Sequence, residues 1–444
     1  MHPTRTQIRC CAARPLLGVL LLLPEIAMRA QGSGGPTFSD ANWTVLGEGL
    51  NGEADALAVS VSDLYAGGTF TTAGGSPANQ IAKWDGNSWR ALGSGTDSIV
   101  RALAVSGSDV YAGGDFTNAG GTAAYYVAKW DGGSWTALGS GMNREVHTLA
   151  VSGNNVYAGG FFTTAGGNTA NGVAKWGGSS WTALGAGVGI SPGGGYVRAL
   201  AVAGSDLFAG GFFTRAGGNA ANNVAKWDGT SWLSLGTGMN DEVEALAVSG
   251  GNVYAGGKFT KAGGNTAYSI AKWDGNSWSP LGSGVNDYVF ALGVAGSDVY
   301  AAGFFSKAGG TVANYIAKWD GSNWSAMGSG VGRNPPPGYV AALAVSESDL
   351  YAGGSFTTAG GKVSPYIARA YLPALPALSV LRSDTQVMVS WPSVDTAGFA
   401  LEQASTLATP AGWVTAAGIT DDGTNKSVTI PGTNRAQFFR LRRL

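Results

Sequence analysis

The chain has little of the chemistry that most enzymes use. Its 444 residues include only two cysteines and two histidines. Both cysteines, Cys10 and Cys11, lie in an N-terminal segment that we expect to be removed, so the mature protein has no thiol nucleophile, disulfide or thiolate metal site. His147 is then the one remaining histidine, without a partner for a catalytic triad or a metal site. We therefore expect no cofactor, no metal and no catalytic residue.

Charge is also scarce. Charged residues make up 12% of the chain, and the formal net charge is −1. A protein that binds nucleic acid or an anionic membrane surface normally carries an excess of basic residues. The composition therefore argues against nucleic acid and against anionic membranes as partners.

One apolar run near the N-terminus is too short to cross a membrane. Residues 16–23 (LLGVLLLL) follow Arg5, Arg9 and Arg14. Basic residues before a short apolar run are typical of a signal peptide, because a membrane span needs about 20 apolar residues. We predict a signal peptide over residues 1–30 and a lead-in over 31–41, giving a secreted or cell-surface protein with no membrane span in the mature chain. A retained N-terminal anchor is the alternative.

Glycine and aromatic residues are abundant. The chain holds 73 glycines, 15 tryptophans, 15 tyrosines and 16 phenylalanines. Frequent turn residues between apolar and aromatic runs favour many short strands over helices. The composition therefore predicts an all-β protein.

One motif recurs along the chain. YAGG or a close variant starts at intervals of 46, 46, 51, 46, 46 and 51 residues, which gives seven repeats with two five-residue insertions. The motif begins at Tyr65, Tyr111, Tyr157, Phe208, Tyr254, Tyr300 and Tyr351.

Each repeat reads as four strands. In the repeat over residues 100–141, we expect strands at 100–105, 110–117, 126–130 and 134–138, a loop at 118–125 and an Asp-Gly turn before the last strand. Such a unit buries its faces only by packing sheet against sheet, as in the blades of a β-propeller. A solenoid is the alternative, but it needs capping repeats at both ends.

The two ends of the repeat region complement each other. Residues 42–49 (NWTVLGEG) read as a fourth strand with no first three before it. The last repeat has its first three strands, ending with 366–372, but no fourth. We therefore predict a seven-bladed propeller over residues 42–372, whose ring is closed by the strand at 42–49.

The pattern YAGGxFTxAGG…VAKWDGxSWxALGSG resembles repeats of bacterial secreted proteins and of fungal cortical cell-polarity marker proteins, within the wider kelch-like propeller group. The resemblance covers residues 42–372 and implies the propeller fold. It implies no single function, because such propellers serve many roles. The copper chemistry of galactose oxidase relatives, which uses histidine ligands and a Cys–Tyr crosslink, does not carry over to a mature chain without cysteine.

The repeat pattern of the sequence ends after Leu372. Residues 373–377 (PALPA) read as a linker, and residues 378–444 as short alternating strands. This C-terminal part resembles a short fibronectin type III-like β-sandwich module. We expect its last segment, FFRLRRL, to be a final strand; a sorting signal is the alternative.

The loops predict where the protein binds. In a propeller, the loops that enter each repeat and those between its second and third strands emerge on one face. Most variation between repeats lies in these loops, including insertions at 189–196 (GISPGGGY) and 332–339 (GRNPPPGY). Variable loops on a rigid scaffold often carry recognition, although neutral drift is the alternative. The predicted binding residues are Arg144, Tyr196, Arg198, Tyr288, Arg333 and Tyr339.

These observations predict a non-enzymatic protein that binds an extracellular glycan or protein through one propeller face. Two alternatives belong to other classes. One is a polysaccharide-active enzyme that works with loop carboxylates, since Asp241, Glu242 and Glu244 lie together and Glu145 has the equivalent place two repeats earlier. The other is a structural surface protein without a ligand.

Two recurring charged positions are expected to be structural. On the third strand of each repeat, we expect a basic stem to cover a tryptophan while its head stays in water; the alternative is a ring of cations for an anionic polymer. These residues are Lys83, Lys129, Lys175, Lys226, Lys272, Lys318 and Arg369. The aspartate of the WDG motif is expected to be a turn residue rather than a metal ligand. This aspartate recurs at Asp85, Asp131, Asp228, Asp274 and Asp320.

Overall fold

A computed structural model of the chain describes residues 38–60, 63–190, 193–346, 348–372, 378–382, 385–392, 399–404, 414–431 and 438–443. The predicted signal peptide, the predicted linker and most of the lead-in lie outside these residues. Residues 38–372 form one compact unit, and the described residues from 378 onward belong to a second. Within the described ranges, no helix is both long enough and apolar enough to cross a membrane.

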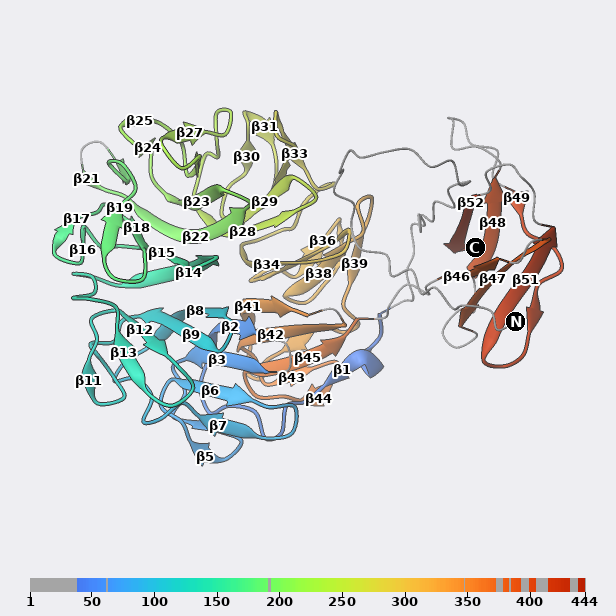
Figure 1. Ribbon diagram of the computed structural model, residues 1–444, viewed down its shortest axis with the longest axis horizontal. Helices are drawn as coiled ribbons and strands as arrows, with labels where there is room; N and C mark the ends of the chain where they lie inside the picture. The colour runs from blue at the N-terminus through green and yellow to red at the C-terminus, as the bar shows by residue number, and fades with distance from the viewer. Residues whose placement is uncertain are drawn as a thin grey trace. The chain divides into compact units, whose positions relative to one another are not determined.

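Residues 38–372 fold into repeated four-stranded antiparallel sheets (Figure 1). One sheet has the order β13-β12-β9-β8, from β8 (Val100–Ser106), β9 (Asp109–Gly114), β12 (Val127–Trp130) and β13 (Trp135–Ala137). The four strands predicted for this repeat are thereby confirmed. The expected loop is wrong in one respect, because it contains the hairpin of β10 (Asn118–Ala119) and β11 (Thr122–Ala123).

The other repeats are built in the same way. Their sheets are β2 (Ala54–Val59), β3 (Leu64–Gly68), β6 (Ile81–Trp84), β7 (Trp89–Ala91); β14 (Val146–Ser152), β15 (Asn155–Gly160), β18 (Val173–Trp176), β19 (Trp181–Ala183); β22 (Tyr196–Ala203), β23 (Asp206–Phe212), β26 (Val224–Trp227), β27 (Trp232–Ser234); β28 (Val243–Ser249), β29 (Asn252–Gly257), β32 (Ile270–Trp273), β33 (Trp278–Pro280); and β34 (Val289–Ala295), β35 (Asp298–Gly303), β38 (Ile316–Trp319), β39 (Trp324–Ala326). Short hairpins equivalent to β10–β11 are β4 (Thr72–Ala73) with β5 (Ser76–Pro77), β16 (Thr164–Ala165) with β17 (Asn168–Thr169), β24 (Arg215–Ala216) with β25 (Asn219–Ala220), β30 (Lys261–Ala262) with β31 (Asn265–Thr266), β36 (Lys307–Ala308) with β37 (Thr311–Val312), and β43 (Thr358–Ala359) with β44 (Lys362–Val363).

The N-terminal piece of the described chain joins the sheet of the last repeat. After the 3₁₀ turn η1 (Asp40–Asn42), β1 (Trp43–Thr44) pairs with β45 (Ile367–Tyr371), which in turn pairs with β42 (Asp349–Ser355) and then β41 (Tyr339–Val345). The paired part is therefore two residues of the segment predicted at 42–49. Trp43 is completely buried, and its Nε1 donates to the carbonyl oxygen of Met327 at 3.0 Å.

Glycines and tryptophans fix the packing of one sheet on the next. A Cβ atom on Gly113 would lie 2.5 Å from Cγ1 of Val146, so the glycine lets the following sheet approach closely. Farther out, Trp130 and Trp135 pack with their ring centroids 5.5 Å apart. The Trp135 Nε1 donates to the carbonyl oxygen of Leu92 in the preceding repeat at 2.8 Å. These contacts recur from repeat to repeat and tie each sheet to its neighbour.

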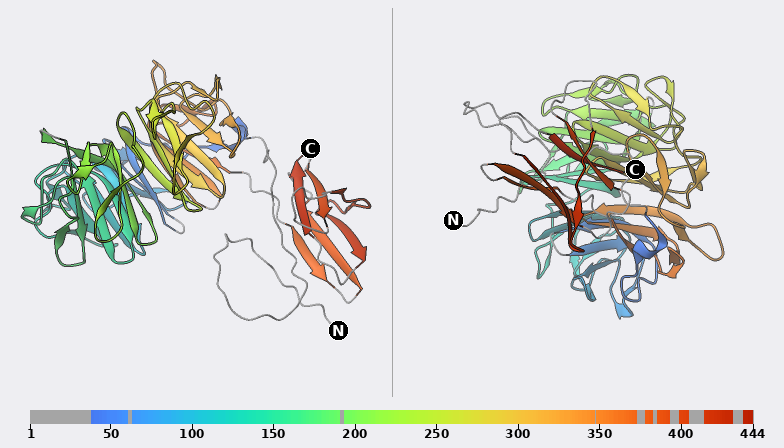
Figure 2. Two further views of the ribbon diagram at one scale, coloured as in Figure 1. Left: turned by 90° about the horizontal axis from the view of Figure 1, so that it is seen from above. Right: turned by 90° about the vertical axis from the view of Figure 1, so that its right-hand side faces the viewer.

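The first strands of the repeats lie beside one another. β2 contacts both β8 and β41, so the first strand of the first repeat meets that of the last (Figure 1; Figure 2). Each of these strands has a β-bulge one residue after its first buried valine or alanine, as between Val100 and Ala102. A bulge leaves one residue unpaired and redirects its side chain.

The C-terminal unit holds two further antiparallel sheets. One has the order β46-β47-β51-β50, from β46 (Ser379–Arg382), β47 (Gln386–Pro392), β50 (Thr420–Asp421) and β51 (Asn425–Pro431). The other has the order β49-β48-β52, from β48 (Phe399–Ala404), β49 (Val414–Thr415) and β52 (Phe438–Arg443). Side chains of both sheets share one core, which includes Val389, Trp391, Leu401 and Phe439.

Candidate functional site

The bulges place one residue of each first strand around a common axis, and we call this set the collar. Four collar residues, with the small residue and the leucine that follow each collar position in every repeat, line a cavity of about 180 Å³. The polar members of its lining come from four consecutive repeats, whereas the other repeats contribute only alanine and leucine. The collar residues are Asp55, Arg101, His147, Arg198, Glu244, Phe290 and Ala341.

Arg101 forms the shortest ion pair of the collar. Its Nε and Nη2 donate to the two carboxylate oxygens of Asp115, each at 2.7 Å. This bidentate geometry fixes the guanidinium and satisfies its charge within the protein. Beside it, burial and the negative charge of Glu53 raise the pKa of Asp55 to about 6. No described side chain donates a hydrogen bond to Asp55.

Arg198 belongs to a four-residue network with no net charge. Its Nε lies 3.2 Å from Glu242 and 3.6 Å from Glu244, and the Nζ of Lys258 lies 2.8 Å from each carboxylate. Burial disfavours the ionised form of Glu242, but the hydrogen bond from Lys258 and the nearby cations outweigh it and lower its pKa. Burial and the charge of Glu242 raise the pKa of Glu244. The two carboxylates therefore differ in basicity although they share one lysine.

His147 is a neutral hydrogen-bond donor at this cavity. Nη1 of Arg198 lies 2.7 Å from the His147 Nδ1. Arginine can only donate, so Nδ1 accepts and the proton of the neutral ring sits on Nε2. Burial, together with the positive charges of Arg198 and Arg101, lowers the pKa of His147 to about 3. No described residue accepts a hydrogen bond from Nε2, which leaves this donor for a ligand.

Aromatic rings continue the site outward from the collar. Phe161 and Tyr196 stack with centroids 4.1 Å apart and planes at 20°, and Phe212 lies 5.7 Å beyond Tyr196. Arg144 lies over the Phe161 ring at 5.4 Å, and Arg198 lies over the Tyr196 ring at 5.4 Å. Phe212 is 41% exposed, so this row offers both apolar surface and guanidinium donors.

Two further clusters lie on the loops that lead into the collar strands. The Tyr339 hydroxyl donates to Glu53 at 2.5 Å, and Nη1 of Arg333 lies 3.8 Å from the same carboxylate. Burial and the bond to Glu53 raise the pKa of Tyr339. Tyr288 is 42% exposed and has Lys258 5.7 Å above its ring.

The six binding residues predicted from the sequence fall into three groups around the collar. Arg144, Tyr196 and Arg198 meet at Phe161, Arg333 meets Tyr339 at Glu53, and Tyr288 joins the network through Lys258. Of the six, Arg198 alone lines the cavity.

Most of the collar was not predicted from the sequence. Asp55, Arg101 and Phe290 were not singled out, and His147 was considered only as a histidine without a partner for a catalytic triad or a metal site. A signal does exist: aligned repeats differ at this position, with Asp, Arg, His, Arg, Glu, Phe and Ala, whereas the residue before it is Val or Ala and the residue after it is Ala or Thr. Its meaning depends on the bulge, which turns a strand position toward the axis.

The two insertions replace a set of side-chain hydrogen bonds between an inter-repeat loop and the next hairpin, which we call the clasp. In the other repeats an Asn or Asp at the equivalent place bonds the next hairpin, as Asn143 Oδ1 does when it accepts from the backbone N–H groups of Thr163 and Thr164. In the inserted loops glycine stands there, and the carbonyl oxygens of Gly189 and Gly332 accept from the backbone N–H groups of the next hairpin. The insertions thus have a structural role besides any role in binding.

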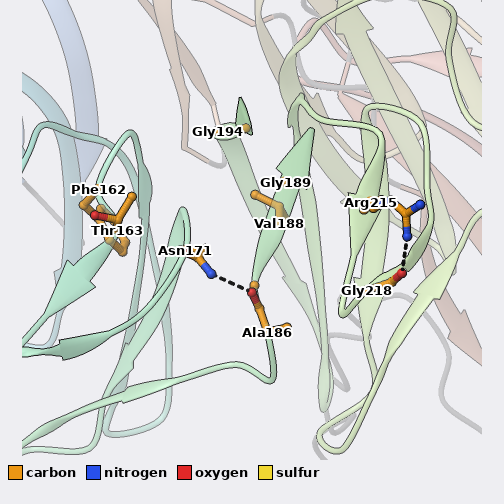
Figure 3. Close-up of a pocket in the computed structure, with 11 residues that line it drawn as sticks. Phe162, Thr163, Asn171, Ala186, Val188, Gly189, Gly194, Arg215 and Gly218 are labelled. Atoms are coloured by element: carbon orange, nitrogen blue, oxygen red, sulfur yellow. Dashed lines mark hydrogen bonds between the residues drawn. The ribbon is translucent and has the colours of Figure 1, made fainter. Parts of the chain in front are cut away.

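The first insertion also forms a second cleft. Strands β20 (Val188–Ile190) and β21 (Gly193–Gly194) join the β24–β25 hairpin in one small sheet, whereas β40 (Val331–Gly332) of the second insertion adds one strand to β43–β44. The cleft has a volume of about 380 Å³, and Val188, Gly189 and Gly194 lie between Thr163 and Arg215 in its lining (Figure 3). None of the predicted binding residues lines it.

The recurring charged residues behave differently from one another. Asp131 is a turn residue as predicted, since its Oδ1 accepts from the backbone N–H groups of Gly133 and Ser134. The basic side chains stay partly exposed to solvent, and in five repeats they also pair with an aspartate at or just before the start of the second strand, which the sequence did not predict. Examples are Lys129 with Asp109 at 2.9 Å and Arg369 with Asp349 at 2.8 Å.

Comparisons with known proteins give no family. No family model matches the chain, and no curated protein matches it. Among solved structures, the computationally designed Ika8 protein aligns over 74% of this chain and 99% of its own, with 18% identity and a TM-score of 0.45. The computationally designed Ika4 protein aligns over 41% of this chain and 94% of its own, with 20% identity and a TM-score of 0.26.

Proposed function

We propose that the repeated sheets are the blades of a closed seven-bladed β-propeller of the kelch-like type, followed by a fibronectin type III-like module. The pairing of β1 with β45 and the contact between β2 and β41 support a closed ring. The two sheets around the core at Trp391 support a sandwich for the C-terminal part. Export to the cell exterior, inferred from residues 1–30, is part of the same proposal.

We further propose that the propeller is a non-enzymatic recognition protein, which binds an extracellular glycan or protein at the collar. The observation that carries this proposal is the contrast within each repeat. Residues that pack the sheets barely change, whereas the collar position, which the bulge leaves unpaired in the sheet, holds a different mixture of charge and aromatic character around one cavity. Polar groups that converge on a cavity of an otherwise regular scaffold are typical of binding sites.

The combined variant Tyr196→Ala, Arg198→Ala and Tyr339→Ala tests this function. We expect it to reduce binding to cell-envelope or matrix material by at least about tenfold, because it removes an aromatic ring, a guanidinium and a bonded phenol around the collar. Pull-down of labelled protein measures the effect, and Leu233→Ser on β27, away from the collar, is the matched control. Unchanged binding by the triple variant would rule out the collar as the binding site. The alternative of a structural surface protein without a ligand would then remain.

A second candidate rests on Glu242 and Glu244. Their shared contact with Lys258 and the opposite directions of their pKa values are arrangements that glycoside-active enzymes also use. Both glutamates are paired with Lys258 and Arg198, which favours a role in positioning these two cations instead. A screen for glycan degradation separates the two: activity that Glu242→Gln abolishes would make the chain an enzyme.

A further inference from the structure

The cavity inside the collar has two unlike halves. Arg101, His147, Arg198 and Glu244 give it a polar arc. Opposite this arc, the lining from the repeats of β34, β41 and β2 consists only of alanine and leucine side chains, such as Leu292. A ligand that fills it needs hydrogen-bonding groups along one edge and an apolar surface on the other.

The polar arc offers several donors and an acceptor with no unbalanced charge. Arg101 is neutralised by Asp115, and Arg198 is neutralised within its network with Lys258 and the two glutamates. Each guanidinium has further N–H groups that take no part in these ion pairs. A carboxylate such as that of Glu244 accepts up to about four hydrogen bonds. An anion or a cation would gain no counter-charge here and would still lose its hydration, so the arc favours a neutral ligand.

His147 adds a donor that nothing in the described protein uses. His147 comes from the repeat between those of Arg101 and Arg198, whose guanidiniums are fixed by their own ion pairs, and it contacts Arg198 through Nδ1. Such preorganised donors suit hydroxyl groups, which accept from them and donate in turn to a carboxylate such as Glu244. A polyhydroxy compound with closely spaced hydroxyls meets both requirements, whereas a single Ser or Asn side chain does not.

The size of the cavity limits how much of a ligand can enter. A volume of about 180 Å³ corresponds to roughly six water molecules at ~30 Å³ each. This suits one sugar ring rather than a chain segment. Because first strands surround the cavity, a sugar ring would enter it along the axis. The aromatic row of Phe161, Tyr196 and Phe212 reaches the collar at Arg198 and offers a surface for the next sugars.

We propose that the collar cavity binds the terminal ring of a neutral glycan, end-on, with its hydroxyls on the arc of Arg101, His147, Arg198 and Glu244 and its apolar C–H face on the alanine and leucine half. This inference rests on the proposed recognition function and names its ligand class. It also specifies that the protein binds chain ends and not internal segments.

Calorimetric titration of the purified protein tests the ligand class. The probes are linear neutral hexasaccharides built from glucose, mannose, galactose or xylose, the cyclic glucose hexamer, a hexauronate, and one acidic and one basic peptide. We expect at least one linear neutral sugar to bind, and the cyclic hexamer, which has no end, to bind at least about tenfold more weakly than the linear glucose hexamer or not at all.

Two variants locate the site. His147→Phe keeps an aromatic ring at this position but removes the Nε2–H donor, and Leu343→Phe fills the apolar half. Each is expected to weaken sugar binding by about tenfold. Leu233→Ser on β27 serves as the control, and near-unchanged melting temperatures exclude misfolding as the cause.

The outcomes separate this inference from the proposed function. If the hexauronate or a peptide binds in a His147-dependent way while neutral sugars do not, the ligand class is wrong and the recognition function stands. Equal affinity for linear and cyclic hexamers would overturn end-on binding. If no probe binds, and the triple variant described above also leaves binding to envelope and matrix material unchanged, both proposals fail.

Discussion

Directly before the third strand of each repeat, one residue holds a positive φ angle. Only one of these residues is glycine, Gly172, although glycine adopts this conformation at least cost. At Ser269, φ is 61°; its N–H donates to the carbonyl oxygen of Phe259, and its carbonyl accepts from the N–H of Gly257. Two backbone hydrogen bonds thus hold a conformation that the side chain disfavours. The non-glycine residues are Gln80, Tyr126, Asn223, Ser269, Tyr315 and Tyr366.

Ser269→Gly is therefore expected to stabilise the protein. The substitution relieves a left-handed conformation that costs roughly 1–2 kcal/mol, less the extra entropy that glycine gains on unfolding, so we expect a net gain of up to about 1 kcal/mol. The reverse change, Gly172→Ala, is expected to destabilise by more than that, because its Cβ would also lie 2.8 Å from Cγ2 of Val188. Urea denaturation of both variants measures the free energy of unfolding. A loss of stability in Ser269→Gly would contradict this reasoning.

Asp55 makes the stability of the protein depend on pH. Its pKa rises on folding from 3.8 to about 6, chiefly because it is buried, so the folded state holds the proton more tightly than the unfolded state. Its stabilising contribution is complete below the unfolded pKa and is lost as pH rises through about 6. We expect Asp55→Asn to be more stable than the parent at pH 7, by at most about 3 kcal/mol, and nearly equal to it at pH 3.5. Denaturation midpoints of both proteins across this range measure the difference, and a difference independent of pH would contradict it.

At the scale of elements, the clasp between each inter-repeat loop and the next hairpin connects consecutive sheets. Asn143 accepts two backbone hydrogen bonds at 2.9 and 3.0 Å and donates to the Thr163 hydroxyl at 2.9 Å. In its repeat, Asp97 accepts the two equivalent backbone bonds from Thr117 and Asn118, and it also accepts from the Thr117 hydroxyl at 2.8 Å. Burial opposes its ionisation, but the bonds from Asn118 and Thr117 outweigh it and lower its pKa to about 2.

Asn143→Ala is expected to destabilise the protein by about 1–3 kcal/mol, because it leaves two backbone N–H groups of the hairpin without their acceptor. Asn143→Asp keeps the acceptor and serves as the control, with most of the stability retained. Thermal denaturation measures both changes. Equal loss in the two variants would show that the clasp does not act through its oxygen.

Most elements were predictable because each repeat contains the turn residues that separate its strands. The glycine pair ends the second strand, and the Asp-Gly turn separates the third from the fourth, so period-2 segments between them could be read directly. The small hairpins, such as β10–β11, were missed because two-residue strands have no period to detect. Most of the collar was missed for a different reason: a bulge depends on the register between two strands, which no single strand specifies.

For the whole molecule, the N-terminal strand links the start of the described chain to its last repeat. Trp43 is fully buried and its ring packs beside Phe38. We expect a chain that begins at Leu50 to unfold earlier than one that begins at Phe38, with a loss of at least about 3 kcal/mol from the buried tryptophan alone. Differential scanning calorimetry of the two chains measures this effect. If the shorter chain melts no earlier, the pairing of β1 with β45 does not stabilise the last sheet.

The same pairing sets the order in which the protein can be completed during synthesis. The Thr44 hydroxyl bonds the carbonyl oxygen of Arg369, a partner 325 positions later in the chain. Trp43 leaves the ribosome before any of the repeats, yet the site into which it packs forms only after the final repeat has emerged. Each intermediate repeat can dock on its predecessor as it appears, because its contacts are local. The N-terminal strand must therefore wait with an unburied tryptophan until the last repeat emerges, and this long-range pairing is the step most open to interference by other chains.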